Sequence, residues 1–181
     1  MAAQQMQHRN TRKGNPWRLA VWGAAAGLLM VPAIAMQVGA DGVHWTTLDF
    51  VVMGTLLGAC CLAYEVATRL SGNTLYRLGF AVAILLGFLL VWINLAVGII
   101  GGEANPANLV FACVLAVGLV GALIGRFTAG GMSRAMVATG IAQLLAGGYA
   151  LALGSMEGGM LSAAFAAMWF TSAALFHKAA R

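Results

Sequence analysis

The sequence predicts an all-α membrane protein, a polytopic bundle of six transmembrane helices arranged as three consecutive hairpins. Three observations lead to this fold. Hydrophobic residues make up 61% of the chain and charged residues 8%, whereas soluble domains carry roughly half and a quarter. Six apolar runs reach the length of about 20 residues that a bilayer crossing needs. All ten Lys and Arg residues fall on alternate connections of this threading, which places both termini in the cytoplasm by the positive-inside rule.

The predicted helices cover about 19–38, 48–68, 78–100, 108–125, 135–153 and 160–176. A basic cytoplasmic tail, 1–18, precedes them, and a second basic tail, 177–181, follows. The basic residues of the cytoplasmic side are Arg9, Arg12, Lys13, Arg18, Arg69, Arg77, Arg126, Arg134, Lys178 and Arg181. The three outward turns carry acids instead, namely Asp41, Glu103 and Glu157. These charges recur with a period near 57, which indicates either a triplicated hairpin or, as we favour, only an up-down bundle that obeys the positive-inside rule.

The first helix, 19–38, follows Pro16 and contains Pro32, which we expect to kink it near its outer third. Its basic flank, short apolar stretch and Pro-Ala-Ile-Ala end are also typical of a secretory signal peptide. We favour an uncleaved membrane helix and keep a cleaved signal peptide as the alternative. The rest of the topology is the same in both cases.

The second helix, 48–68, holds the two acidic residues that lie inside a predicted span, and such residues are functional candidates by default. Asp49 lies in the first turn, where threonine caps and the positive end of the helix dipole suit a carboxylate. Glu65 lies four residues before Arg69, the spacing of an ion pair on one helix face. About 24 Å of helix and about 160° of rotation separate the two carboxylates. We therefore favour structural roles for both and exclude a joint acid–base pair.

Two amides lie deep in predicted spans. Asn94 lies about two-thirds of the way along the third helix, beside Trp92, and Gln143 lies near the middle of the fifth. A carboxamide at such a depth needs hydrogen-bond partners. The two side chains are natural counterparts of each other, either as an interhelical hydrogen bond or as groups that face a ligand. Both interpretations stay open.

The turn "GGEANPAN" joins the third and fourth helices. We expect Gly101 and Gly102 to end the third helix, and Asn105 to cap the fourth with Pro106 at its first position. Asn108 is expected to cap from the third position. These helix-end roles account for the glycines, asparagines and proline of the turn but assign no role to Glu103.

Glu103 belongs to a predicted outward polar cluster. Its other members are Asp41, His44, Trp45, Asp49 and, slightly deeper, Asn94. Such a cluster suits a cation, a polar head group or another protein.

Small residues at helical spacing predict a tightly packed bundle. Gly-x-x-x-Gly pairs, which allow close helix contact, occur at Gly23/Gly27, Gly54/Gly58, Gly98/Gly102, Gly121/Gly125 and Gly154/Gly158. Cys60, Cys61 and Cys113 lie in apolar runs and are interpreted as packing residues. Histidine is absent from mid-helix positions, so a bis-histidine haem has no support, and no recognised metal-binding or catalytic motif is present. We predict no cofactor, no metal, no catalytic residue and no nucleic-acid partner, because the basic residues already have a role in orientation.

The stretch "VWINLAVGIIGGEANPANLVF" and its upstream neighbours, roughly residues 49–126, carry a further clue. They are similar to uncharacterised bacterial inner-membrane proteins with a Trp-x-Asn…Gly-Ile-Ile-Gly-x-Glu-x-Asn-Pro-Ala-Asn pattern. The resemblance implies a multi-pass protein of the bacterial inner membrane and implies no mechanism.

Three functional hypotheses follow from these residues. The first is a non-catalytic accessory protein that binds membrane lipids, other membrane subunits or a second copy of itself. The second is a small oligomeric transporter or channel for a weakly charged solute, with Asn94 and Gln143 in the path. The third is a membrane enzyme with an outward carboxylate site at Asp49 and Glu103.

Overall fold

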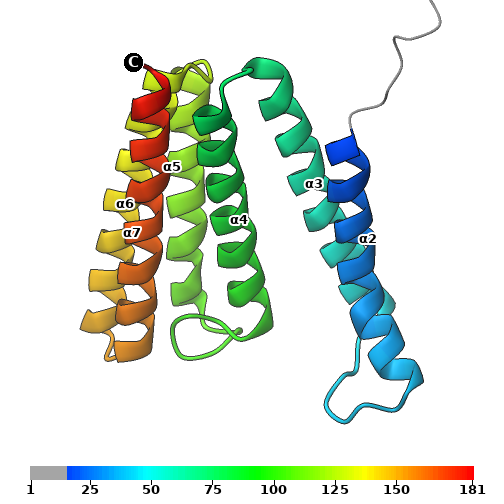
Figure 1. Ribbon diagram of the computed structural model, residues 1–181. Helices are drawn as coiled ribbons and strands as arrows, with labels where there is room; N and C mark the ends of the chain where they lie inside the picture. The colour runs from blue at the N-terminus through cyan, green and yellow to red at the C-terminus, as the bar shows by residue number, and fades with distance from the viewer. Residues whose placement is uncertain (1–15) are drawn as a thin grey trace, which may run out of the picture. The chain divides into compact units, whose positions relative to one another are not determined.

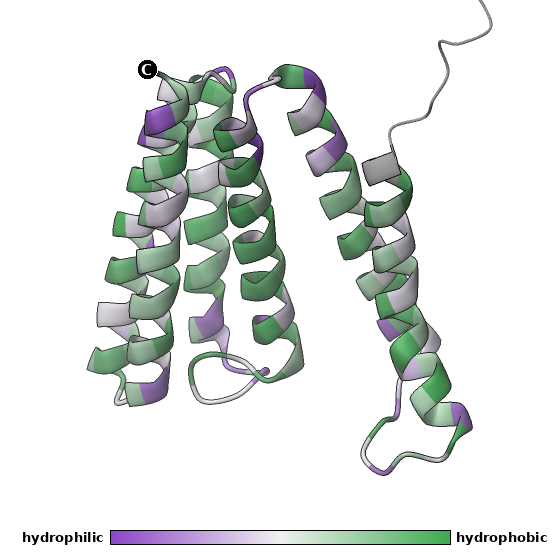
Figure 2. Cartoon of the chain, viewed as in Figure 1, coloured by the Kyte–Doolittle hydropathy of each residue, from purple (hydrophilic) through white to green (hydrophobic). Residues whose placement is uncertain are grey.

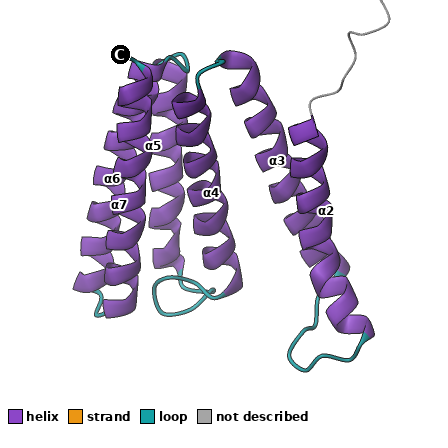
Figure 3. Ribbon diagram, in the orientation of Figure 1, coloured by secondary structure: helices purple, strands orange, loops and turns teal. Residues whose placement is uncertain are grey.

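The computed structural model describes residues 16–181, with side chains from residue 19 onward. Within that range every regular element is a helix and no strand is present (Figure 3). In chain order the elements are α2 (Pro16–Gln37), α3 (Thr47–Leu70), α4 (Thr74–Ala96), the short 3-10 helix η2 (Pro106–Leu109), α5 (Val110–Ile124), α6 (Ala129–Ala152) and α7 (Met156–Ala179). Six segments of this described chain are long and apolar enough to cross a membrane, with η2 and α5 together forming the fourth. The predicted all-α fold with six membrane helices is confirmed, whereas residues 1–15 of the predicted basic tail lie outside the described range.

The chain forms two compact units, one ending at Glu65 and one running from Val66 to Arg181. The boundary between them falls within α3, near its end. The first unit contains α2 and most of α3. The second contains the last turn of α3 and the helices α4 to α7.

The first unit is a hairpin of α2 and α3. The Cys61 thiol lies 3.9 Å from the Val21 carbonyl oxygen, and a Cβ added at Gly54 would lie 3.7 Å from a Leu29 methyl group. Residue numbers thus rise along α2 as they fall along α3, so the two helices are antiparallel. α2 continues through Pro32 to Gln37.

The second unit is a bundle in which α7 packs against both α6 and α4, and α5 packs against α6 (Figure 1). Its largest fully buried apolar side chains are Leu86, Leu90, Phe111, Val114 and Phe176. We call the two ends of the bundle the Glu103 end, where the α4–η2 loop and the α6–α7 turn lie, and the Arg126 end, where the α5–α6 turn and the C-terminus lie.

Charged residues of the second unit are separated between these ends. The Glu103 end carries Glu103 and Glu157. The Arg126 end carries Arg69, Arg77, Arg126, Arg134, Lys178 and Arg181. Hydrophobic residues dominate the lengths of helix between them (Figure 2). The alternation of charge along the sequence therefore corresponds to a separation in space within this unit.

Aromatic rings join the helices at the Arg126 end. The Tyr76 hydroxyl of α4 donates a hydrogen bond of 2.6 Å to the Phe127 carbonyl oxygen in the α5–α6 turn. The Phe127 ring stacks on Phe80, with centroids 6.3 Å apart, and Phe80 and Tyr76 each meet Phe176 edge to face. These contacts hold Phe127 at φ 55°, a left-handed conformation that bulky residues rarely adopt.

Small residues bring α6 close to its two neighbours. A Cβ added at Gly121 of α5 would lie 2.9 Å from the Ala135 Cβ, and one added at Gly147 of α6 would lie 2.7 Å from the Ser162 Cβ of α7. Lipid gives helices no hydrophobic reason to associate, so van der Waals contact between closely approaching backbones supplies the attraction. The predicted close packing is present at Gly121, whereas Gly23 and Gly27 of α2 have no heavy atom within 4 Å of an added Cβ.

Several predicted helix ends differ from the structure, including both ends of the last helix, which was expected at 160–176 and runs over Met156–Ala179. Two other helices show the reason. The third helix was expected at 78–100, but α4 begins after its cap residue Asn73, which accepts hydrogen bonds from two backbone N–H groups, and ends at Ala96. The fifth was expected from 135, but α6 begins six residues earlier because the Thr128 hydroxyl caps the Gly131 N–H. In both cases hydropathy reports the apolar stretch and overlooks polar or glycine-rich turns that still make helical hydrogen bonds.

The contact between α6 and α7 gives a direct test of this packing. Gly147→Ala is expected to lower the free energy of unfolding by about 1–3 kcal/mol, because the added methyl group has no room against Ser162. Gly148→Ala is the matched control, since no heavy atom lies within 4 Å of its added Cβ and Ala favours a helix over Gly by up to about 1 kcal/mol. Denaturant unfolding of the purified full chain measures both. Equal effects of the two substitutions would contradict the packing described here.

Candidate functional site

The α4–η2 loop is the irregular segment around which the candidate site forms. α4 ends because Gly98 turns the backbone to φ +69° while its N–H still bonds to the Ile93 carbonyl oxygen. A Cβ at Gly98 would overlap the Gly102 carbonyl group, so the loop folds back closely on itself. The expectation that Gly101 and Gly102 end the helix was wrong, because the helix has already ended at Ala96.

Asn108 holds this loop in place. Its Oδ1 accepts hydrogen bonds from the Ile99 and Ile100 N–H groups at 3.0 and 2.8 Å, and its Nδ2 donates to the Gly102 carbonyl oxygen at 2.7 Å. A further contact joins Nδ2 to the Ile100 carbonyl oxygen at 3.4 Å. The predicted capping role was therefore wrong: the side chain reaches back across the loop instead of along its own helix.

Asn105 caps η2 as predicted. Its Oδ1 accepts a hydrogen bond of 3.0 Å from the Ala107 N–H, and Pro106 occupies the first helical position. The cap directs the chain away from the loop and into α5.

The loop also rests on the α6–α7 turn. The Ser155 hydroxyl donates to the Ile99 carbonyl oxygen at 3.3 Å and accepts from the Gly158 N–H. A Cβ at Gly158 would lie 2.9 Å from the same carbonyl oxygen. The Glu103 end of the bundle is therefore a connected structure built from the loop, η2 and the start of α7.

A cavity of about 420 Å³ lies between α4, the loop, η2 and α5. We call it the first cavity. Its apolar wall is formed by Leu90, Val91, Leu95, Ala104, Pro106, Leu109, Phe111, Ala112 and Leu115. Its polar side chains are Asn94, Glu103, Asn105 and Asn108. Four of the eight predicted site residues therefore meet here, and the combination of a long apolar wall with a few polar groups is typical of a small-molecule site.

Asn94 is one of the polar residues on the cavity lining, and its amide oxygen is closed to solvent. Its Nδ2 donates to the Leu90 carbonyl oxygen at 2.7 Å, one turn back in the same helix. Its Oδ1 is buried and accepts no hydrogen bond from the described residues. The interhelical hydrogen bond considered for Asn94 was wrong, because the bond that it makes stays within α4.

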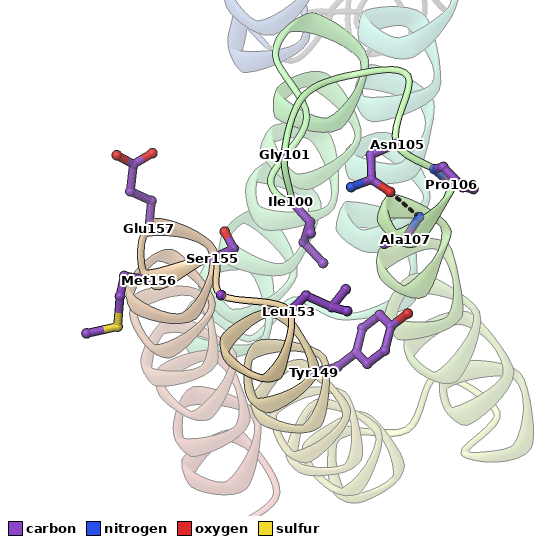
Figure 4. Close-up of a pocket in the computed structure, with 11 residues that line it drawn as sticks. Ile100, Gly101, Asn105, Pro106, Ala107, Tyr149, Leu153, Ser155, Met156 and Glu157 are labelled. Carbon is purple, nitrogen blue, oxygen red and sulfur yellow. Dashed lines mark hydrogen bonds between the residues drawn. The ribbon is translucent and has the colours of Figure 1, made fainter.

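A second cavity, of about 770 Å³, lies on the other side of η2 (Figure 4). Tyr149 and Leu153 of α6 form part of its wall, together with Ile100, Asn105 and Ser155. In Figure 4 the amide nitrogen of Asn105 faces this cavity, whereas the Glu157 carboxylate points away from it. Sequence reasoning did not single out Tyr149, which lies in an apolar run like any aromatic residue near a membrane surface.

The other predicted site residues are placed elsewhere. Gln143 is completely buried, and neither its oxygen nor its nitrogen has a hydrogen-bond partner among the described residues. It is therefore not the counterpart of Asn94 that the sequence led us to expect. Trp92 packs its ring on Phe88 of the same helix, with centroids 5.6 Å apart.

The Ser162 hydroxyl and the Trp169 indole nitrogen of α7 are likewise buried without a hydrogen-bond partner among the described residues. Sequence reasoning overlooked both. Single serine and tryptophan residues in an apolar helix carry no signal that separates a buried face from a lipid-facing one.

Asp49 and His44 belong to the first unit and line neither cavity. Asp49 forms a reciprocal cap with Thr46: its Oδ2 accepts from the Thr46 N–H and hydroxyl at 2.7 and 2.8 Å, and its own N–H donates to the Thr46 hydroxyl oxygen at 3.3 Å. This is the helix-start arrangement known as a capping box, with an Asp at its third position. His44 is exposed.

No protein-family model, curated protein or solved structure matches the chain. Among the residues that the structure describes, no three His, Cys, Asp or Glu side chains are grouped so that they could hold a metal ion. The polar side chains that line the first cavity are three amides and one carboxylate.

The role of Asn108 can be tested by removing its side chain. Asn108→Ala leaves the Ile99 and Ile100 N–H groups of two buried residues without their acceptor, at a cost of about 1–3 kcal/mol for each group. Hydrogen exchange of the full chain should show faster exchange at the Ile99 and Ile100 amides.

Asn105→Ala is the control, because it removes a single cap bond worth about 1 kcal/mol. It should leave exchange at Ile99 and Ile100 unchanged. Protected amides at both positions in Asn108→Ala would show that the loop does not depend on this side chain.

Proposed function

We propose that this chain is a non-catalytic integral protein of the bacterial inner membrane that binds a membrane lipid in the first cavity and acts as an accessory protein. Six helices able to cross a membrane make it a multi-pass membrane protein. The single observation that carries the proposal is the first cavity itself, which combines one long apolar wall with a small polar group at the Glu103 end.

The shape and chemistry of the first cavity suit an amphipathic molecule. A volume of about 420 Å³ lies within the range of about 300–1,000 Å³ that is usual for small-ligand sites. Leu95 and Leu109 on its wall are 56% and 70% exposed, so the apolar wall continues onto the outer surface of the helices. In a bilayer an acyl chain can lie along that surface while the polar head lies beside the exposed Glu103.

The other two hypotheses have less support. Gln143, which the proposed transport path requires, lines neither cavity. Asp49, which the enzyme hypothesis requires, has its carboxylate engaged in a helix cap. These placements favour a binding function over transport or catalysis.

The proposal includes an orientation, with both termini in the cytoplasm and the Glu103 end outside. It is supported by the separation of basic and acidic residues in the second unit, because basic residues are retained on the cytoplasmic side. In this orientation the first cavity opens near the outer leaflet.

Cysteine labelling tests the orientation. In a background with Cys60, Cys61 and Cys113 replaced by Ala, Glu157→Cys should react with a membrane-impermeant maleimide added to intact spheroplasts. Arg134→Cys should react only after the membrane is permeabilised, because it lies at the opposite end of the bundle. The reverse pattern would overturn the proposed orientation.

Native mass spectrometry tests lipid binding. The full chain, gently extracted, is expected to retain lipid, and Ala112→Trp should reduce the lipid-bound fraction at least about tenfold, because the indole fills the first cavity that Ala112 lines. Ala116→Trp, one turn further along α5 and outside the cavity lining, is the matched control. A bare wild-type protein, or equal lipid retention by both variants, would count against the proposal.

A further inference from the structure

We infer that the Arg126 end of the second unit is a docking surface for anionic phospholipids, which it recognises by the negative charge of their heads. This inference is independent of the first cavity, which lies at the opposite end of the bundle. It comes from three basic side chains, those of Arg126, Arg134 and Lys178, that the fold gathers at this end and leaves without partners.

Arg126 lies on a tightly held turn between α5 and α6. Its backbone has φ 49°, and that of Phe127 has φ 55°. The Tyr76 hydroxyl donates a hydrogen bond of 2.6 Å to the Phe127 carbonyl oxygen, and a Cβ at Gly131 would overlap the Gly125 carbonyl group. The turn is therefore fixed by contacts on both sides, while the side chain of Arg126 remains exposed.

Arg134 and Lys178 lie on the two helices that pack together beside this turn. The hydroxyl of Ser133, the residue before Arg134, donates a hydrogen bond of 3.0 Å to the Ala173 carbonyl oxygen of α7. Lys178 follows Ala173 by five residues, which is about 7.5 Å along a helix. Both basic side chains are exposed. Two further cations thus accompany Arg126 at one end of the bundle.

The fold does not neutralise these three cations. Among the residues that the structure describes, their side chains make no hydrogen bond or ion pair, whereas Arg77 donates to the Thr68 and Ser71 carbonyl oxygens. The acids of the second unit, Glu103 and Glu157, lie at the other end. The 24 residues of α6 span about 36 Å, several times the Debye length of about 8 Å in physiological salt.

Orientation in the membrane does not account for the lack of acids at this end. The positive-inside rule counts Lys and Arg, and Asp and Glu contribute little to it, so acids could accompany the cations without changing the orientation. Their absence from this end of the second unit leaves a positively charged surface at the ends of helices able to cross a membrane.

A lipid phosphate suits this surface. It matches the planar fork of an arginine and the point charge of a lysine. In an anionic phospholipid the phosphate charge is uncompensated, whereas a zwitterionic phospholipid carries an ammonium group that cancels it. The surface should therefore prefer the anionic lipid.

The test is native mass spectrometry of the full chain with two synthetic lipids that share their acyl chains, the anionic phosphatidylglycerol and the zwitterionic phosphatidylethanolamine. Phosphatidylglycerol is expected to bind at least about tenfold more tightly, because each basic residue near an anionic membrane surface contributes about fivefold. The preference should fall when ammonium acetate is raised from about 0.05 M to about 0.5 M, because salt screens exposed charges.

Variants locate the surface. Arg126→Gln, Arg134→Gln and Lys178→Gln should each lower the preference by about twofold to fivefold, and the triple variant should lose it. Arg126→Lys combined with Arg134→Lys keeps the charge and should retain most of it. Glu157→Gln at the other end and Ala112→Trp in the first cavity should leave it unchanged. Thermal unfolding should change little in all the charge variants, because the altered side chains are exposed.

The outcomes separate this inference from the proposed lipid site in the first cavity. Equal binding of the two lipids, or a preference that survives in the triple variant, would overturn the docking surface and leave the first cavity untouched. A preference lost in Ala112→Trp would place the anionic lipid in the first cavity instead. Soluble glycerol 3-phosphate is the remaining arm: if it displaces phosphatidylglycerol at equal concentration, the partner is a free phosphate ester and the inference fails.

Discussion

A single carboxamide, that of Asn108, supplies hydrogen bonds that the backbone of the α4–η2 loop cannot make to itself. A backbone N–H or C=O group that is buried without a hydrogen-bond partner destabilises a membrane protein, which is why membrane-spanning segments are normally helical. Between Ala96 and Pro106 the chain is not helical. The Asn108 side chain therefore supplies hydrogen bonds in place of those that a helix makes along its backbone. The shape of the first cavity follows from this, because the loop that Asn108 fixes carries Glu103 and forms one of its walls.

The membrane helices were predictable from the sequence because the features that identify them are sums over many residues. Apolar length and the position of basic residues each sum over many residues, so one misleading residue does little harm. Boundaries depend on single residues instead. Gly98 ended α4 through a left-handed conformation, and Thr128 started α6 through one hydroxyl. A hydropathy pattern contains neither the sign of φ nor the direction of a side chain.

The site was predicted in part for a similar reason. Asn94, Glu103, Asn105 and Asn108 were singled out as polar residues in or next to an apolar run, and they line one cavity. Their individual roles were less accessible, since a carboxamide can cap, cross a loop or bond back to its own helix, and only the fold decides which. The pairing of Asn94 with Gln143 failed on this point: depth along a helix was readable from the sequence, whereas the direction around the helix needed the packing of α6 on α7.

Asn105 and Pro106 line both the first and the second cavity, so the start of η2 is a partition with a chamber on each side. The proline ring fixes φ near −65° and stiffens the backbone at that point. Any rearrangement of this segment therefore changes the lining of both cavities at once.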